Sequence, residues 1–254
     1  MGDMNHLAAW VTSCLLLSLR IMPTFLFAPP FTLARVPRSV TALLGLGLAM
    51  VLVGTFPEPA LLPEVSAKVL LPGAVRELIL GLVPVVVLQL LFGGLYLAGR
   101  TIDIQAGFGL AMLIDPTTRG QLPMVGTIFA YVAAVTFFAM GGQFDLLRFF
   151  AASLKSISLG SPYHLGSIGA LAAYASTVSL IAFGIGGAAI TALLLTDMVI
   201  AMLSRTVPQL NALLLGIQVK AILLLAVVPV ALGFSGALFA RLVADALETM
   251  PRLL

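Results

Sequence analysis

The chain has 254 residues, of which 61% are hydrophobic and 9% are charged, whereas an ordinary soluble domain has about 45–50% apolar and about 25% charged residues. This composition, with a mean hydropathy of +1.15, excludes an ordinary soluble enzyme and predicts an integral membrane protein with several spans of about 20 apolar residues each. With one cysteine and two histidines, the chain can form no internal disulfide and no thiolate metal site. Its net charge is only +3, and its Lys and Arg residues are scattered singly, which argues against a nucleic-acid partner.

Uncharged stretches mark the expected spans, because a charge at the centre of a bilayer costs about 2.5–3.5 kcal/mol. The first apolar run begins at Leu7 and ends in no small-residue cleavage pattern, so we expect a first span and not a removable signal. The long uncharged stretch at 156–196 begins with Ser, Gly and Pro, which indicates a loop before its helix. We expect six spans, at about residues 7–29, 39–56, 78–99, 120–144, 168–196 and 221–240.

The spans at 78–99 and 120–144 are apolar on every side. A soluble helical bundle would instead show one apolar stripe on each helix, and an outer-membrane barrel would alternate apolar and polar residues in segments of about ten. We therefore predict an all-α, polytopic helical membrane protein with about six hydrophobic helices, forming a single domain over residues 1–254.

Small residues recur four positions apart, a spacing that lets two helix backbones approach closely. Such pairs serve packing within one chain or an interface between subunits, and the sequence leaves both open. The pairs are Gly45 with Ala49, Ala182 with Gly186, and Gly184 with Ala188.

The segment between the third and fourth expected spans does not resemble a surface loop. It reads RTIDIQAGFGLAMLIDPTTRGQLP at 100–123, with an apolar middle in which Gly107 and Gly109 weaken a helix by about 1 kcal/mol each. Irregular apolar backbone at membrane depth is tolerated where protein or a water-filled cavity covers it, which predicts a re-entrant or pore-facing loop. A helix end followed by a packed turn explains the same residues.

Arg20 lies near the middle of the first expected span, where an uncompensated charge is costly. It should face a carboxylate, backbone carbonyls or a polar cavity. A structural ion pair is the commoner arrangement, and Asp103 and Asp197 are conceivable partners.

The chain lacks the usual catalytic frameworks. It contains no GxxxxGK[ST] phosphate loop, no HExxH, no GxSxG and no CxxC, which are the usual signatures of phosphate, zinc, acyl-transfer and redox chemistry. We therefore expect no enzyme, no cofactor and no metal site.

Three stretches, in the first, middle and last thirds of the chain, carry a family resemblance. They read RIMPTFLFAPPFTLARVPRSVTALLGLGLA at 20–49, GFGLAMLIDPTTRGQLPMVG at 107–126, and RTVPQLNALLLGIQVK at 205–220. Together they resemble the FliR family of flagellar export-gate subunits and its injectisome counterparts, called SctT.

The resemblance implies a non-enzymatic subunit that joins FliP-like and FliQ-like subunits in a hetero-oligomeric helical complex around an export channel. Unfolded flagellar subunits would pass through the channel, with FlhA-like and FlhB-like proteins docked nearby. It also implies the bacterial inner membrane and the flagellar basal body as the location, with membrane lipid as a neighbour. An injectisome subunit remains an alternative, as does a small-solute transporter with a midplane site built from broken helices.

In the family, the central loop acts as a plug that narrows the channel, which places this role on about 106–123 here. An apolar constriction excludes water and ions by dewetting, so Gly107 and Gly109 would be hinges for an apolar seal. The implied plug residues are Gly107, Phe108, Gly109, Leu110, Ala111, Met112, Leu113, Ile114, Asp115 and Pro116. The implied assembly contacts are Arg20, Arg35, Pro37, Arg38, Arg205, Pro208, Gln209, Asn211 and Lys220.

Overall fold

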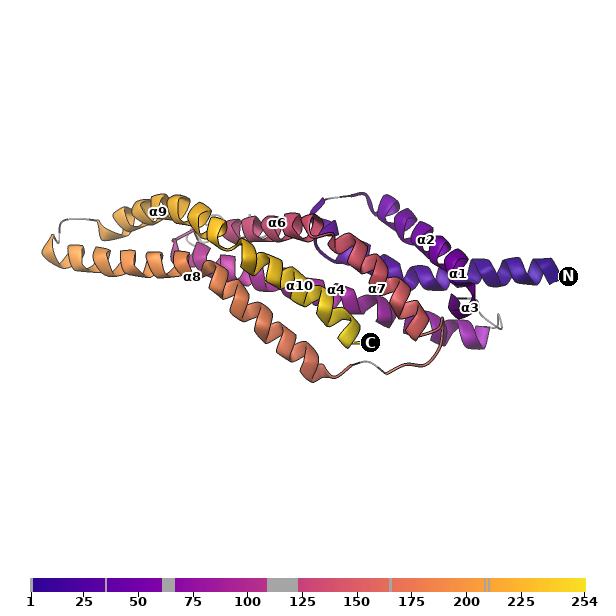
Figure 1. Ribbon diagram of the computed structural model, residues 1–254. Coiled ribbons are helices and arrows are strands. Elements are labelled where there is room, and N and C mark those ends of the chain that lie inside the picture. Colours follow the sequence, from indigo (N-terminus) through magenta and orange to yellow (C-terminus); the bar gives the residue numbers. More distant parts are fainter. Residues whose placement is uncertain are drawn as a thin grey trace. The chain divides into compact units, whose positions relative to one another are not determined.

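The computed structural model describes residues 2–34, 36–60, 67–108, 123–164, 166–207, 209 and 211–254. These residues form helices and connections, with no strand among them, so the predicted all-α class is confirmed. In chain order (Figure 1) the helices are α1 (Gly2–Phe27), the short 3-10 helix η1 (Phe31–Ala34), α2 (Arg38–Thr55), α3 (Pro57–Ala60), α4 (Ala67–Gln105), α6 (Met124–Ala139), α7 (Gly142–Ser156), α8 (Ile168–Thr206), α9 (Ala212–Phe234) and α10 (Gly236–Arg252).

Five stretches of helix in the described part of the chain are long and apolar enough to cross a membrane. A sixth is added if the bent pair of α6 and α7 counts as one span. The five are Leu7–Phe27, Arg38–Thr55, Leu70–Gln105, Ile168–Thr206 and Leu214–Phe234. The predicted polytopic chain with about six hydrophobic helices is therefore confirmed.

Two helices are much longer than the expected spans at 78–99 and 168–196. Both α4 and α8 have 39 residues, which corresponds to about 60 Å of helix against a hydrocarbon core of about 30 Å. The expected spans were bounded by charged residues, but a helix can continue past a charged residue. Its long polar side chain can reach the membrane surface or pair within the protein.

The fourth expected span, at 120–144, is broken by a bend. Helix α6 ends at Ala139, and the chain bends by 67° before α7 begins. Gly141 has a φ of +79°, a left-handed conformation that glycine adopts without steric cost. Helix α7 then carries Asp145 and Arg148, so the apolar pattern changes at this bend.

The last expected span, at 221–240, is also displaced. Helix α9 ends at Phe234, and the Ser235 hydroxyl donates to the Ala231 carbonyl at 2.7 Å. A separate helix, α10, follows from Gly236 and carries apolar residues on one side and charged residues on the other. The apolar run thus covers the end of a span and the start of an amphipathic helix.

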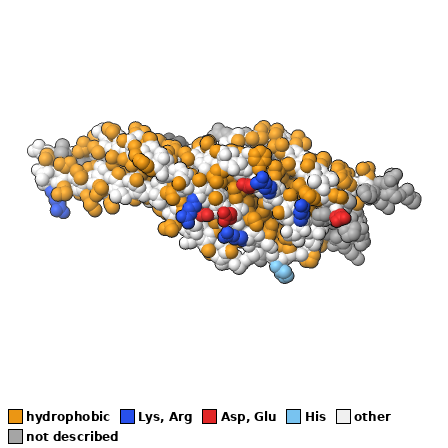
Figure 2. Space-filling view, viewed as in Figure 1, with side chains coloured by type: hydrophobic (Ala, Val, Ile, Leu, Met, Phe, Trp, Pro, Cys, Tyr) orange, Lys and Arg blue, Asp and Glu red, His pale blue; other side chains and the backbone are white. Residues whose placement is uncertain are grey.

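The chain folds into two compact units, and the prediction of a single domain stays a prediction. One unit contains Met1–Leu90, Phe137–Tyr174 and Val243–Leu254, and the other contains Leu91–Thr136 and Ala175–Leu242. In the first unit, the exposed ion pairs Asp145–Arg148 and Glu248–Arg252 give α7 and α10 polar surfaces. Figure 2 shows charged side chains gathered on part of one face, with hydrophobic side chains over much of the rest.

Two of the predicted small-residue pairs serve packing inside a unit. Gly45 and Ala49 are buried on α2, and a Cβ on Gly45 would lie 3.2 Å from Met22 Cγ on α1. On α8, Ala182 is buried, and a Cβ on Gly186 would lie 3.1 Å from Ile102 Cδ1 on α4. The third pair, Gly184 with Ala188, lines an open groove between α8 and α9.

Candidate functional site

Arg20 pairs with Glu77 inside the first unit. The Arg20 Nε donates to Glu77 Oε2 at 2.6 Å, and Nη2 donates to Oε1 at 3.0 Å. Both side chains are 1% exposed, so the expected structural ion pair is confirmed. The conceivable partners Asp103 and Asp197 are wrong, because Glu77 pairs with Arg20, while Asp103 accepts from the Val125 amide and Asp197 pairs with Lys220.

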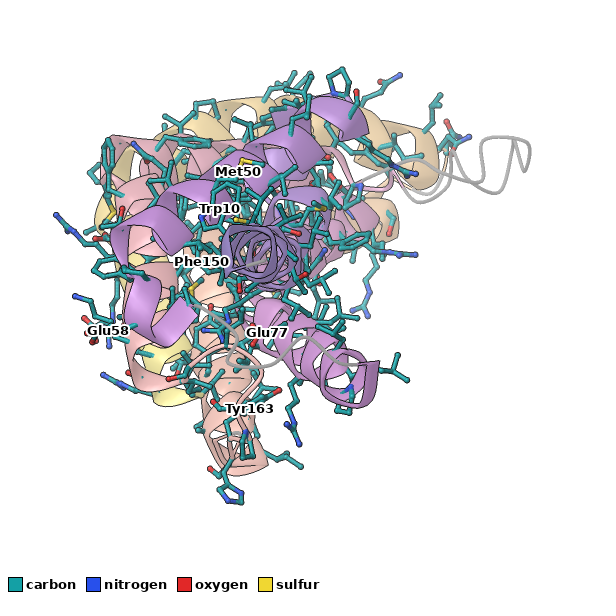
Figure 3. The ribbon with its side chains drawn as sticks, turned by 90° about the vertical axis from the view of Figure 1, so that its right-hand side faces the viewer. Trp10, Met50, Glu58, Glu77, Phe150 and Tyr163 are labelled. Carbon is teal, nitrogen blue, oxygen red and sulfur yellow. The ribbon has the colours of Figure 1, made fainter. Side chains whose placement is uncertain are left out.

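The remaining hydrogen-bonding groups of this ion pair are satisfied by the end of α7 and the connection after it. Arg20 Nη1 donates to Ser153 Oγ at 3.3 Å, and Nη2 donates to the Ile157 carbonyl at 3.2 Å. The Gly160 amide donates to Glu77 Oε1 at 2.9 Å. The cluster therefore joins α1, α4 and α7, and Figure 3 marks Glu77 within it.

Helices α1 and α4 meet closely beside the ion pair. A Cβ on Gly81 would lie 2.5 Å from the Arg20 carbonyl oxygen, a distance that no side chain could occupy without moving a helix. Because Gly81 lies one turn after Glu77, the close approach brings the carboxylate within reach of the arginine. Sequence reasoning missed Glu77, and the available signal was its place immediately before the uncharged stretch at 78–99.

In the second unit, Asp103 connects the end of α4 to the start of α6. Both carboxylate oxygens of Asp103 accept from the Val125 amide at 3.3 Å. A helix start has unpaired amides and a partial positive charge, so a carboxylate placed there stabilises it. Residues 103 and 125 bracket the central loop, and Asp103 therefore holds its two ends together.

Two glycines make this junction possible. A Cβ added to Gly99 would lie 2.1 Å from the Gly126 amide nitrogen, and one added to Gly126 would lie 3.0 Å from the Tyr96 carbonyl oxygen. The backbones of α4 and α6 are in direct contact here. Only a pair of glycines allows this approach, so the ends of the central loop are fixed by backbone contact as well as by Asp103.

Lys220 also contacts the end of α4. Its ammonium forms an ion pair with Asp197 on α8 and donates to the Gln105 carbonyl at 3.0 Å. The last carbonyls of a helix lack partners within it, and a cation satisfies them well. The charge of Lys220 is thus paired within the chain, with an aspartate that is 43% exposed.

Two of the predicted plug residues, Gly107 and Phe108, lie among the described residues, directly after the end of α4. Gly107, just after the end of α4, has a φ of +91°, a left-handed conformation that glycine adopts without steric cost, and its role as a hinge stays a prediction. The Phe108 amide donates to the Asp103 carbonyl at 3.0 Å. The other predicted plug residues, at 109–116, lie outside the described residues.

The predicted assembly contacts do not form one cluster. Arg35 and Pro208 lie outside the described residues. In the first unit, Pro37 and Arg38 lie at the start of α2. In the second unit, Arg205, Gln209 and Asn211 are exposed at or near the connection between α8 and α9, and Asn211 Oδ1 accepts from the Leu214 amide at 3.2 Å. Their role in assembly stays a prediction.

Among the described residues, no group of three or more His, Cys, Asp or Glu side chains could hold a metal ion. Two clusters of polar side chains in the described part of the chain join different helices: Arg20, Glu77 and Ser153 in one unit, and Asp197 and Lys220 in the other. Both clusters join helices, and both consist of partners that neutralise or hydrogen-bond one another. The arrangement is suited to holding helices at fixed distances.

Comparison with known proteins agrees with the resemblance seen in the sequence. FliR of Bacillus subtilis (strain 168), a flagellar biosynthetic protein, is 27% identical over 221 residues, which cover 85% of each chain. FliR of Escherichia coli (strain K12) is 26% identical over 245 residues, or 92% of each chain, and FliR of Aquifex aeolicus (strain VF5) is 26% identical over 149 residues, or 58% of this chain and 57% of the relative. The model of the family described as bacterial export proteins, family 1, matches residues 11–246, and the chain therefore belongs to this family.

Proposed function

We propose that this chain is a non-enzymatic subunit of the flagellar type III protein export gate, in the bacterial inner membrane at the flagellar basal body. It would form, with FliP-like and FliQ-like subunits, the channel through which unfolded flagellar subunits are exported, with FlhA-like and FlhB-like proteins nearby. The observation that carries the proposal is similarity to flagellar FliR proteins over 85–92% of the chain. These relatives are flagellar biosynthetic proteins, which favours a flagellar role over an injectisome.

The central loop would act as the plug of this channel. Its two ends are held by Asp103, by the contact between Gly99 and Gly126, and by Lys220. A loop that must open and close around a passing chain needs a fixed base, because otherwise its position in the channel would vary. Met and Gly within the loop would let the apolar seal reshape around different segments of the exported chain.

Native mass spectrometry of the intact particle tests the assembly. The tagged chain is co-expressed with its genomic neighbours and extracted in mild detergent. We expect one large complex that contains several copies of two other hydrophobic proteins, the FliP-like and FliQ-like subunits. A monomer or small homo-oligomer under the same conditions would contradict the gate and favour a small-solute transporter, which solute-uptake measurements would then test.

Ion leak in growing cells tests the plug. Residues 108–113 are replaced by Gly and Ser, which removes the apolar seal and keeps the loop length. We expect the cells to leak ions, because a polar constriction remains filled with water, through which ions can pass. The same particle is weighed to show that assembly is normal, and an unchanged leak in a normally assembled complex would rule out the seal.

A further inference from the structure

A small open pocket lies in the first unit, where the connection between α7 and α8 contacts the first turns of α4. It has a volume of about 360 Å³ and is lined by Arg76, Ile79, Pro162, Tyr163 and His164. Figure 3 marks Tyr163 on this connection. All of these lining residues belong to the first unit, so the pocket is formed within one compact part of the chain.

Hydrogen bonds hold the connection against α4 and fix the shape of the pocket. The Gly160 amide donates to Glu77 Oε1 at 2.9 Å, and the Gly160 carbonyl accepts from Arg76 Nη1 at 2.9 Å. The Tyr163 hydroxyl donates to the Arg76 carbonyl at 3.0 Å. The pocket is therefore formed before any ligand binds, because its two walls are already bonded to each other.

The Arg76 guanidinium at this pocket has donors to spare. An arginine carries five N–H donors, and the bond from Nη1 to the connection uses one of them. Within the described ranges no carboxylate lies at ion-pair distance from Arg76, and the adjacent Glu77 is already bound by Arg20. The exposed arginines of α7 and α10 differ, since Arg148 and Arg252 each pair with a carboxylate on their own helix.

Exposed apolar side chains continue from the pocket along α4. They recur at helical spacing, and each is at least 38% exposed: Leu71, Val75, Leu78, Ile79, Leu82 and Val86. We call these residues the α4 stripe. From its first member to its last the helix rises about 22 Å, or roughly four turns. The stripe is long enough for a second helix to pack alongside it, and the pocket opens beside it, with Ile79 common to both.

The occupant of this surface must supply an acceptor for Arg76 as well as apolar contacts. Arg76 directly precedes Glu77, which forms the buried ion pair with Arg20, and it lies inside the apolar stretch Leu70–Gln105 of α4. An unpaired charge in apolar surroundings is costly, and hydrocarbon offers it no acceptor. A protein helix offers both kinds of contact, because a carboxylate can lie among its apolar side chains.

We propose that the α4 stripe packs against an apolar helix of a neighbouring subunit, whose Asp or Glu side chain enters the pocket and pairs with Arg76. A carboxylate accepts two parallel hydrogen bonds from a guanidinium. Arginine is enriched at the buried centres of protein interfaces, and a charge pair there fixes the register of the two partners. The inference rests on the proposed function, which supplies the neighbouring subunits, and adds the position and the chemistry of one contact.

Photocrosslinking in the intact complex tests the contact. The photoreactive residue p-benzoylphenylalanine replaces Leu78, which is 43% exposed on the α4 stripe, in the full chain co-expressed with its genomic neighbours. After irradiation, mass spectrometry of the purified complex identifies the attached peptide. We expect an apolar helical segment of another subunit, with an Asp or Glu within one helical turn of the attached residue.

Charge reversal tests the ion pair. Arg76→Glu places two like charges together at the contact, which is strongly unfavourable where water is excluded. We expect the recovery of the neighbouring subunits with this chain to fall about ten-fold or more. Replacing the partner carboxylate found by crosslinking with Arg should restore recovery with the Arg76→Glu chain. Arg148→Glu reverses a charge that is 80% exposed on α7 and should leave recovery unchanged.

The helical content and elution volume of the Arg76→Glu chain show whether it folds, and the crosslink from position 78 tests the contact with Arg76 intact. Crosslinks to lipid alone, or to this chain's own residues such as Glu64, would overturn the proposal. Unchanged recovery with Arg76→Glu, or no restoration by the reversed partner, would overturn it too. If the unmodified chain assembles with FliP-like and FliQ-like subunits but the crosslink reaches no other subunit, this inference fails and the proposed function stands. If the unmodified chain assembles with no other subunit, the proposed function fails as well.

Discussion

Arg20 and Glu77 form a bidentate ion pair, in which two N–H groups of the guanidinium donate to the two carboxylate oxygens at 2.6 and 3.0 Å. Each side chain is 1% exposed, so hydration does little to stabilise either charge. Removing both charges from water is costly, and their attraction offsets that cost only when the geometry is good and the other polar groups are bonded. Ser153, Ile157 and Gly160 supply those bonds.

Glu77→Gln should destabilise the chain strongly. The amide keeps the shape of the side chain but leaves the buried Arg20 charge without a counter-charge, and breaking a buried pair in this way costs about 3–5 kcal/mol. The measurement is the unfolding of the purified chain in detergent, followed by circular dichroism. Arg148→Gln is the control, because its exposed pair with Asp145 contributes little to stability.

The double variant Arg20→Met, Glu77→Met distinguishes the loss of the whole ion pair from the loss of one of its charges. Apolar residues of similar volume often replace a buried ion pair without loss of stability. We therefore expect the double variant to be more stable than Glu77→Gln alone. Equal stability of the unmodified chain and Glu77→Gln would show that this ion pair does not hold α1 to α4.

Gly99→Ala should destabilise the junction of α4 and α6. The added methyl group would lie 2.1 Å from the Gly126 amide nitrogen, so the helices would have to separate, and overpacking of this kind costs about 1–3 kcal/mol. Gly93→Ala is a matched control on the same helix, since nothing lies within 4 Å of its added Cβ. It should be neutral or stabilising by up to about 1 kcal/mol, and the same unfolding measurement compares the two variants.

Asp103→Leu should weaken the start of α6. The Val125 amide loses its acceptor, and loss of a side-chain acceptor at a helix start costs about 0.5–2 kcal/mol. Asp103→Asn keeps one acceptor oxygen and should fall between Asp103→Leu and the unmodified chain. The measurement is the protease resistance of the central loop in the purified complex, and equal cleavage rates in all three chains would show that Asp103 does not hold the loop ends.

Hydropathy predicted the fold class and the number of spans because the cost of unpaired backbone groups in a bilayer forces long apolar segments into helices. It could not locate the ends of the helices. The bend at Gly141 depends on a left-handed backbone conformation, and the break at Ser235 divides an apolar run into two helices. Neither feature changes the average hydropathy of the segment that contains it.

The candidate site could be predicted only in part, for a related reason. Arg20 had to have a partner because of its depth in the membrane, but the choice of Glu77 depends on the close approach of α1 and α4 at Gly81. The contact of Gly99 with Gly126 and the hydrogen bond from Lys220 to the Gln105 carbonyl likewise depend on which helices are neighbours in the fold. Spacing in one sequence carries no information on which helices are neighbours, so these contacts could not be read from it.

Lys220→Met should loosen the end of α4 and the base of the central loop. The variant keeps an apolar side chain of similar length but removes the ion pair with Asp197 and the hydrogen bond to the Gln105 carbonyl. Hydrogen bonds to charged groups contribute about 1.5–3 kcal/mol, so the amides of 106–108 should exchange hydrogen about ten-fold faster or more. Hydrogen exchange followed by mass spectrometry on the purified complex measures this.

Lys155→Met is the control for this prediction, because Lys155 lies over the Phe56 ring at 4.5 Å in the other unit and its loss should leave exchange at 106–108 unchanged. Lys220→Arg keeps the charge and should retain part of the protection. Motility of cells that carry each variant then shows whether the base of the loop matters for export. Unchanged exchange and normal motility in Lys220→Met would show that Lys220 is neither an anchor of the loop nor an assembly contact, since both roles need its charge.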